Sequence, residues 1–275
     1  MRAYCNNNQT TSCANAKNNR LIMEKYRIGK VYISRTTPEK TIANIEQAIK
    51  EERSEYICVS NVRTVAYANK KKNKDYRDLM NNAFMCTPDG MPLVWMARLW
   101  GLKDVQRTVG PDLFTAMLND RESGIRHFLL GDTEETLAQM KEKYANNGSN
   151  IVGSYSPPFC ELDDFDYEGI AKQINDSGAD IVWLSLRAPK QDFFAVRLLP
   201  HLDRKICIGV GAAFRFSLGQ IKHPPKIFKK LGLTGIFWRK MNMSKIGWYF
   251  HHFALLCKWG TGILASRCIG KKYYE

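Results

Sequence analysis

Short apolar segments alternate with segments of helical periodicity along most of the chain, and this alternation constrains the fold more than any other feature. The segments predicted as strands are Tyr56–Val59, Phe84–Cys86, His127–Leu130, Ile151–Tyr155, Ile181–Leu186 and Ile206–Val210. Several are apolar throughout, as parallel strands buried on both faces are. Helical patterns lie between them at Thr41–Glu51, Pro92–Leu99, Pro111–Asp120, Glu134–Tyr144 and Gly169–Asp176. The sequence therefore predicts an α/β fold with a Rossmann-like, mostly parallel sheet flanked by helices.

The length of 275 residues allows one large domain and a smaller appendage. Residues 1–22 are rich in Asn, Thr and Ser without an apolar period, so we expect a disordered or mis-assigned N-terminal extension. Residues 23–220 contain all the predicted strands and form the predicted α/β domain. Residues 221–275 form a basic, aromatic-rich helical appendage.

The net charge of the chain is concentrated in this appendage. The formal charge is +14, and residues 221–275 contribute +10 of it through eleven basic residues and one acidic residue. On a helical projection Ile246, Tyr249, Phe250, Phe253 and Leu256 share one face, with His251 and Lys258 opposite.

This pattern is typical of an amphipathic helix that lies on an anionic membrane surface. Histidine and basic residues interrupt every window long enough to span a bilayer, so we do not expect a transmembrane helix. Two alternatives remain for the appendage. It could pack on the α/β domain or in a homo-oligomer, or it could bind nucleic acid, a partner that the pattern disfavours.

The eight cysteines include no Cys-x-x-Cys pair, and Cys58, Cys86 and Cys207 fall within predicted strands. Free cysteine in a strand behaves as a small apolar residue. The first twenty residues are polar and do not resemble a secretory signal. We therefore expect unpaired thiols and a cytoplasmic protein, peripherally associated with the inner face of the cell membrane.

The segment Phe84–Leu113 has the most distinctive arrangement of polar residues. A predicted strand runs into the turn Thr87-Pro88-Asp89-Gly90, a helical pattern follows, and Arg107 precedes a Gly110-Pro111-Asp112 helix start. Open α/β sheets bind ligands at the carboxyl ends of their strands, so a carboxylate at this place is suited to chemistry. An ordinary Pro-Asp-Gly turn is the alternative interpretation.

Two further blocks follow in order and extend this pattern. They are Ala188-Pro189-Lys190-Gln191-Asp192 and Gly209-Val210-Gly211-Ala212-Ala213-Phe214, and the second leads into Phe216 and Gly219. Together with the Asp-Gly and Arg-x-x-Gly-x-Asp-Leu motifs, these blocks resemble the WecG/TagA/CpsF glycosyltransferases (family 26) over roughly residues 28–233. The resemblance implies an inverting sugar transfer and a C-terminal appendage that docks to the membrane.

The resemblance also implies roles for the residues in these motifs. Asp89 would be the base that takes the proton of the acceptor hydroxyl, and Gly90 leaves room for the substrate. Arg107 would bind the donor phosphate or a sugar carboxylate, because a guanidinium matches such groups bidentately. Gln191 would lie near the donor sugar. Asp112 is the alternative carboxylate, although its position favours stabilisation of a helix N-terminus.

Other residues are predicted to bind substrate. Lys190 would contact phosphate, with a solvated surface lysine as the alternative. Asn61 would line the pocket, and Thr87 belongs to the turn before Asp89. The family usually has Thr at the position of Val59, and Ser60 could replace that hydroxyl.

Nucleotide binding is predicted at Gly131 and at the Gly209-Val210-Gly211 turn, where free backbone N–H groups would face phosphate or ribose. Two residues near the predicted nucleotide site differ from those that are usual in the family that the chain resembles. Arg215 occupies a position that is usually acidic in the family, and Arg187 one that is usually Gly. Both add positive charge beside the predicted donor site.

Asp164-Phe165-Asp166 spells the Asp-x-Asp of metal-dependent glycosyltransferases, but it immediately precedes a helical pattern, where Asp commonly caps. The resemblance implies no metal and no other cofactor. The predicted reaction moves a sugar from a UDP-sugar to a polyprenyl-diphosphate-linked acceptor in bacterial surface polysaccharide biosynthesis. The alternatives are a non-catalytic membrane-bound scaffold of a polysaccharide assembly complex and, more weakly, an oxidoreductase, although Phe214 breaks the dinucleotide fingerprint.

Overall fold

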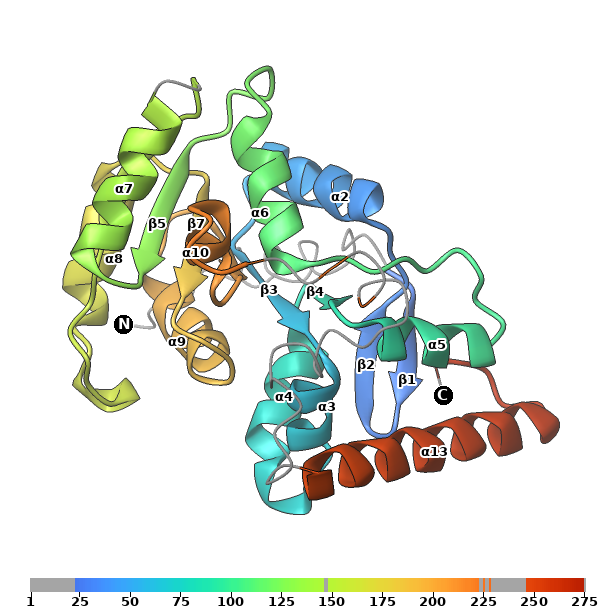
Figure 1. Cartoon of the computed structure of the whole chain (residues 1–275). Coiled ribbons are helices and arrows are strands. Elements are labelled where there is room, and N and C mark those ends of the chain that lie inside the picture. Colours follow the sequence, from blue (N-terminus) through green and yellow to red (C-terminus); the bar gives the residue numbers. More distant parts are fainter. Residues whose placement is uncertain (1–22, 146–147, 223–224, 226–227, 229–245, 275) are drawn as a thin grey trace, which may run out of the picture.

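Six parallel strands form the central sheet in the computed structural model, which describes residues 23–145, 148–222, 225, 228 and 246–274 (Figure 1). The strands are β3 (Glu55–Ser60), β4 (Met85–Pro88), β5 (His127–Gly131), β6 (Ile151–Tyr155), β7 (Ile181–Ser185) and β8 (Ile206–Gly209). They lie in the order β4-β3-β8-β7-β5-β6, and every neighbouring pair is parallel. The predicted α/β fold is confirmed, and each predicted strand lies within two residues of its observed bounds.

Helices cover both faces of this sheet. On one face lie α2 (Pro38–Lys50), α6 (Gly110–Asn119), α7 (Glu134–Ala145) and α10 (Ala213–Ser217). On the other lie α3 (Val62–Ala68), α4 (Lys74–Asn82), α8 (Tyr167–Asp176) and α9 (Lys190–Leu198), with the short 3₁₀ turns η1 (Lys71–Asn73), η2 (Leu162–Asp164) and η3 (Leu199–His201). Because both faces are covered, β4, β5, β7 and β8 consist entirely of buried residues.

A small antiparallel hairpin that the sequence analysis did not predict precedes the sheet. It consists of β1 (Lys25–Ile28) and β2 (Val31–Ser34), and Gly29 turns between them with a φ of +64°. The side chains of Tyr26, Ile28, Val31 and Ile33 are fully buried. The hairpin shares its hydrophobic core with α3, α4 and α5 (Met91–Leu99).

The last helix, α13 (Ile246–Cys268), packs against α5 and α3 and lies along the lower side of the molecule in Figure 1. Trp259 and Ile263 are buried in the same core as the hairpin, and Leu256 packs against it. Arg267 donates a hydrogen bond from Nη1 to the Leu99 carbonyl at 2.7 Å. Packing on the α/β domain, one of the two alternatives for the appendage, therefore accounts for one face of α13.

The predicted apolar face of this helix is divided in the structure. Leu256 points toward the core, whereas the side chain of Phe253 is 66% exposed. The side chains of Ile246, Tyr249 and Phe250 lie outside the described residues. None of the helices in the described part of the chain combines the length and the apolar character needed to cross a bilayer.

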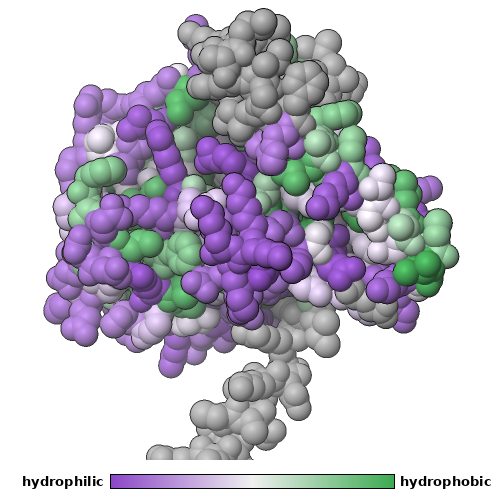
Figure 2. Space-filling model, turned by 90° about the horizontal axis from the view of Figure 1, so that it is seen from below, coloured by the Kyte–Doolittle hydropathy of each residue, from purple (hydrophilic) through white to green (hydrophobic). Residues whose placement is uncertain are grey.

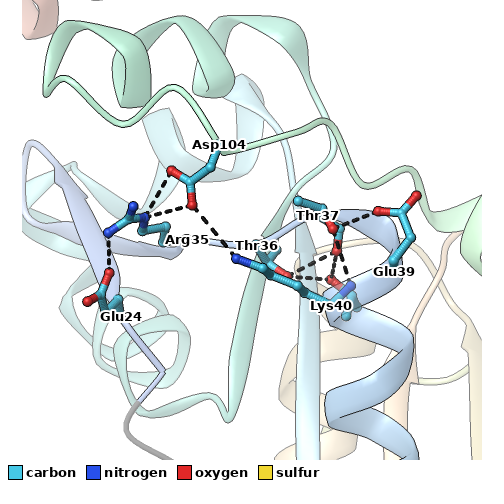
Figure 3. A network of polar contacts seen from close by, with 8 residues as sticks. Glu24, Arg35, Thr36, Thr37, Glu39, Lys40 and Asp104 are labelled. Atoms are coloured by element: carbon cyan, nitrogen blue, oxygen red, sulfur yellow. Dashed lines mark hydrogen bonds and ion pairs between the residues drawn. The ribbon is translucent and has the colours of Figure 1, made fainter.

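A polar network ties the hairpin and α2 to the segment that leads from α5 to α6 (Figure 3). Arg35, just after β2, donates from Nε to both carboxylate oxygens of Asp104, at 3.0 and 2.9 Å. Lys40 of α2 lies 3.8 Å from the same carboxylate. Two residues after Asp104, the Gln106 N–H donates to the Thr36 carbonyl at 3.0 Å. The network therefore fixes the path of the chain that carries Arg107.

We expect Asp104→Ala to lower the free energy of unfolding by about 1 kcal/mol at neutral pH, since it removes a partly exposed charge-assisted pair. Partial burial raises the pKa of Asp104, but the hydrogen bonds from Arg35 outweigh it and leave the pKa below its usual value. The carboxylate thus stabilises the fold above its unfolded pKa of ~3.9, and this contribution disappears as the pH falls through the folded pKa.

Urea denaturation of the wild type and the variant at neutral and acidic pH measures both effects. Asp78→Ala is the matched control, because it removes only the exposed pair with Lys74 within α4, worth about 0.3–0.5 kcal/mol. Equal losses in the two variants would contradict a special role for the network.

Candidate active site

Residues from distant parts of the chain meet where β3, β4 and β8 end. The Asp89 N–H donates to the Ser60 carbonyl at 2.7 Å, so the turn after β4 lies against the end of β3. Gly110 at the start of α6 lies against both β3 and β8, because a Cβ added there would meet the Val59 side chain and the Val210 carbonyl at 3.4 Å each. The three motifs predicted from the sequence are therefore neighbours at the carboxyl edge of the sheet.

Asp89 and Arg107 form the centre of this edge. Arg107 donates from Nε to the backbone carbonyl of Asp89 at 2.6 Å. Its Nη2 lies 4.0 Å from Asp89 Oδ1, which is an ion pair without a direct hydrogen bond. Among the described residues, Asp89 Oδ1 has no hydrogen-bond partner, although this atom is buried. The Arg107 guanidinium is thus held by the Asp89 main chain, and the carboxylate retains an unused acceptor.

Burial raises the pKa of Asp89 to about 6, against the opposing effect of the Arg107 guanidinium, and the nearby charge of Asp112 raises it further. A carboxyl group with this pKa is mostly ionised at neutral pH and is more basic than an ordinary aspartate. That is the property required of a general base, whose pKa should lie near the working pH. The side chain as a whole is 26% exposed, so a ligand can reach it.

Two buried threonines beside Asp89 also hold unpaired oxygens. The Oγ1 atoms of Thr87 and Thr108 have no hydrogen-bond partner in the described part of the chain. Thr87 lies opposite Val59 in the register of β3 and β4, and the Thr108 N–H donates to the Pro88 carbonyl at 2.9 Å. Buried hydroxyls are normally bonded, so a ligand that paired with them would recover the cost of their burial. Thr108 was not predicted, because nothing in its sequence context distinguishes it.

Ser60 and Asn61 are placed at the same edge, but their side chains have other partners. The Ser60 hydroxyl lies 2.9 Å from Cys86 Sγ. Asn61 caps α3, where its Oδ1 accepts from the Arg63 and Thr64 N–H groups at 3.0 and 3.3 Å. The structure therefore does not support Ser60 as a replacement for the hydroxyl missing at Val59. A Cβ added at Gly90 would make only an ordinary contact, 3.5 Å from Pro92, so the space beside Asp89 is open.

Gln191 is 3% exposed and acts on the loop after β8. Its Oε1 accepts from the Gly211 N–H at 3.0 Å, while Ser185 Oγ donates to the Gly211 carbonyl at 2.6 Å. A Cβ added at Gly209 would meet Gln191 Nε2 at 2.6 Å and Asp192 Oδ1 at 3.0 Å, so a side chain there would have to displace Gln191. The prediction of a free N–H at Gly211 is therefore wrong. The side chain of Gln191 holds this N–H in place instead.

Asp192 supports the same arrangement from the core. Its Oδ2 accepts a hydrogen bond of 2.6 Å from the Tyr76 hydroxyl of α4. Burial raises the pKa of Asp192 to about 7, although hydrogen bonds from Tyr76, Gln191 and Cys58 oppose this shift. The motif Lys190-Gln191-Asp192 thus connects α9, α4 and the loop after β8.

Arg215 forms a bidentate pair with Asp132, the residue that follows Gly131 at the end of β5. Nε and Nη2 of Arg215 lie 2.9 and 2.7 Å from the two carboxylate oxygens. The Arg215 side chain is 41% exposed, whereas that of Asp132 is 5% exposed. Arg215 is therefore paired with a buried acid and still faces solvent at the same edge of the sheet.

Lys190 and Arg187 lie on the outer side of these loops. Lys190 Nζ donates to the Cys160 carbonyl and lies 5.1 Å from the centre of the Phe165 ring. To contact phosphate, as predicted, this ammonium group would have to leave these partners. Arg187 is exposed and has a φ of +63°, a left-handed conformation that favours glycine. An arginine in this conformation is unusual, because a left-handed φ is disfavoured for residues with a side chain.

Asp166 caps α8, accepting from the Gly169 N–H at 2.8 Å, as its place before a helical pattern suggested. In the part of the chain that the structure describes, no three His, Cys, Asp or Glu side chains gather as metal ligands would. The predicted independence from metal stays a prediction. A surface cavity of about 440 Å³ opens beside Asp112, lined also by Thr115, Lys143 and Ser217.

A comparison with known protein families agrees with this arrangement. The family model described as "Glycosyl transferase WecG/TagA/CpsF family" matches residues 26–248, which is most of the chain. The matched range includes all six strands of the sheet and the hairpin except for its first residue, Lys25.

We expect Gly209→Ala to lower the free energy of unfolding by about 2 kcal/mol, because the new methyl group would displace Gln191 or Asp192 from a buried, hydrogen-bonded arrangement. Urea denaturation measures the loss. Gly262→Ala is the matched control, since a Cβ at this position of α13 would meet nothing within 4 Å. The control should be neutral or slightly stabilising. A Gly209→Ala protein as stable as the wild type would show that the site tolerates a side chain there.

Proposed function

Because the chain belongs to the WecG/TagA/CpsF family of glycosyltransferases, we propose that it moves a sugar from a UDP-sugar to a polyprenyl-diphosphate-linked sugar with inversion at the anomeric carbon. The proposed setting is the assembly of a bacterial surface polysaccharide at the cytoplasmic face of the membrane. One observation carries the catalytic part: a carboxylate with a raised pKa and an unpaired, buried oxygen lies at the carboxyl edge of the sheet, beside an arginine.

In the proposed reaction Asp89 takes the proton of the acceptor hydroxyl as the acceptor oxygen attacks the anomeric carbon of the donor. The bond between this carbon and the diphosphate oxygen breaks, and UDP leaves with the electron pair. A single displacement of this kind inverts the anomeric configuration, because the acceptor enters on the face opposite the leaving group.

Arg107 is the residue we assign to the negative charge of the donor. Its side chain is 18% exposed and its Nε is already bonded to the Asp89 main chain, so the guanidinium is held in one orientation. A fixed cation stabilises charge that develops on the departing diphosphate without reorganisation. Arg215, held by Asp132, supplies a second oriented guanidinium at the nucleotide side. Both roles need no metal ion.

We further propose that α13 contributes to contact with an anionic membrane. Its inner face is occupied by the α/β domain, but Phe253 on the helix and Ile269 just after it are 66% and 71% exposed. Lys258 is also exposed. Exposed bulky apolar residues interspersed with lysines are typical of proteins that bind the interface of a bilayer.

If Asp89 is the base, kcat/KM should fall about tenfold per pH unit below a pH of about 6, because the protonated carboxyl cannot accept the proton. Asp112→Asn should move this limb to lower pH, since it removes a negative charge that raises the pKa of Asp89. Arg107→Gln should move it to higher pH, since it removes the opposing cation. The measurement is acceptor-dependent UDP release from a panel of UDP-sugars, with a short-chain polyprenyl-diphosphate-sugar as acceptor.

Asp89→Asn is the control for the identity of the base. We expect it to reduce kcat by about 10²–10⁴-fold and to leave UDP binding and thermal stability nearly unchanged. Normal turnover by Asp89→Asn, or an acid limb that does not respond to Asp112→Asn, would refute the assignment of the base.

We expect the double variant Phe253→Asp/Ile269→Asp to bind vesicles of phosphatidylcholine and phosphatidylglycerol at least about tenfold more weakly than the wild type. Vesicle sedimentation measures the binding. The control is Phe159→Asp, which changes a fully exposed aromatic residue on the loop after β6, at the opposite edge of the sheet. Equal binding by the double variant and the wild type would argue against α13 as a membrane contact.

A further inference from the structure

The loop between α3 and α4 presents a block of exposed lysines that the proposed reaction does not use. Lys70, Lys71, Lys72 and Lys74 lie within five residues and are all exposed. Lys74 pairs with Asp78. Within the described residues, no hydrogen bond or ion pair engages the side chains of the other three. Such a block repels itself, and its charge is available to an anionic partner.

This loop has a defined shape. Asn73 donates from Nδ2 to the Tyr67 carbonyl at 2.8 Å, and its N–H donates to the Lys70 carbonyl at 3.1 Å. Arg77 of α4 reaches the Ala68 carbonyl at 3.4 Å. The lysines are therefore displayed from a closed turn, so less conformational entropy is lost when they bind than in an open loop.

The loop lies on the same side of the molecule as α13. Figure 1 shows the foot of α3 and α4 beside the first turns of α13, and the two helices α3 and α13 are in contact. Figure 2 views the molecule from this side, where hydrophobic and hydrophilic patches lie next to one another. Tyr67, 39% exposed, stands at the last turn of α3. Lysines beside exposed aromatic residues match the charge and the polarity gradient of a lipid headgroup layer.

We propose that residues 70–74 form a second membrane contact, outside the C-terminal appendage, that binds anionic phospholipid headgroups together with α13. This inference rests on the proposed function in supposing a lipid-linked acceptor. The short distance between the loop and the carboxyl edge of the sheet supports the inference. The seven residues of α3 span about 10 Å between the loop and Asn61 at the carboxyl edge. A sugar on a membrane-anchored diphosphate would have to extend only about that far to reach Asp89.

The test compares full-length wild type with Lys70→Glu/Lys71→Glu/Lys72→Glu in sedimentation with vesicles of phosphatidylcholine alone or mixed with equal phosphatidylglycerol. The matched control is Lys50→Glu/Arg121→Glu/Lys141→Glu, which makes the same change in net charge elsewhere. Lys50 ends α2, Arg121 lies in the loop after α6 and Lys141 lies in α7. All of these residues are exposed. Melting curves by circular dichroism verify that both variants are folded.

We expect the loop variant to bind mixed vesicles about a hundredfold more weakly, since each lysine near an anionic surface contributes about a fivefold preference. The control variant should lose much less, and binding to phosphatidylcholine alone should be weak for all three proteins. Equal losses in the two variants would overturn the inference, because the effect would then come from net charge. The inference would also be overturned if the loop variant bound vesicles as strongly as the wild type. The proposed contact through α13 would then still stand.

Two other outcomes separate this inference from its premise. If the wild type binds none of these vesicles, the membrane part of the proposed function fails and the loop contact fails with it. If the loop variant instead loses binding to single-stranded RNA while it keeps its vesicle binding, the loop is a nucleic-acid contact and the inference is wrong.

Discussion

The position of β3 between β4 and β8 is the constraint on which the site depends. β3 pairs with β4 through Val59 and Thr87, and with β8 through Cys58 and Gly209. These pairings align the carboxyl ends of three strands whose residues are far apart in the sequence. The turn that holds Asp89 is then bonded to the end of β3, and the start of α6 is packed against both β3 and β8. Without this order of strands the polar motifs of the chain would be separate loops.

The two halves of the edge differ in how their polar groups are satisfied. Around the loop after β8, Gln191, Ser185 and the Asp192–Tyr76 pair occupy the available donors and acceptors, so the protein itself fixes that loop. Around Asp89, buried oxygens are left without partners. Buried polar groups that lack partners are costly and cluster where ligands bind. The loop after β8 is therefore held by the protein itself, whereas the end of β4 keeps buried oxygens that a ligand could pair with.

The appendage and the catalytic edge are connected through α5. This helix begins directly after Asp89 and Gly90, and α13 packs on it through the core around Trp259 and Ile263. Arg267 reaches the last turn of the same helix. The helix that we propose as a membrane contact is thus supported by the helix that follows the proposed base. After α5, the hydrogen bonds between Arg35 and Asp104 fix the segment that leads to Arg107.

The sequence by itself determined the α/β architecture, the six strands and the edge at which the polar motifs lie, because hydrophobic periodicity and turn residues are local properties. The turn after a predicted strand located Asp89, whereas Arg107 was selected because it stands in a motif that resembles the family. The hairpin β1–β2 escaped prediction, as did the unpaired oxygen of Thr108. A short hairpin acquires its stability only when its alternate residues are buried by distant helices.

Only the tertiary structure decided which polar groups remain unpaired. Gln191, Lys190 and Asn61 carry the same functional groups in any fold, but here their partners are a backbone N–H, a backbone carbonyl and a helix start. The division of α13 into a packed face and an exposed face was decided in the same way, since the helical pattern alone does not state what covers each face. Hydrogen bonds and burial between residues far apart in the chain depend on three-dimensional position, which local sequence does not encode.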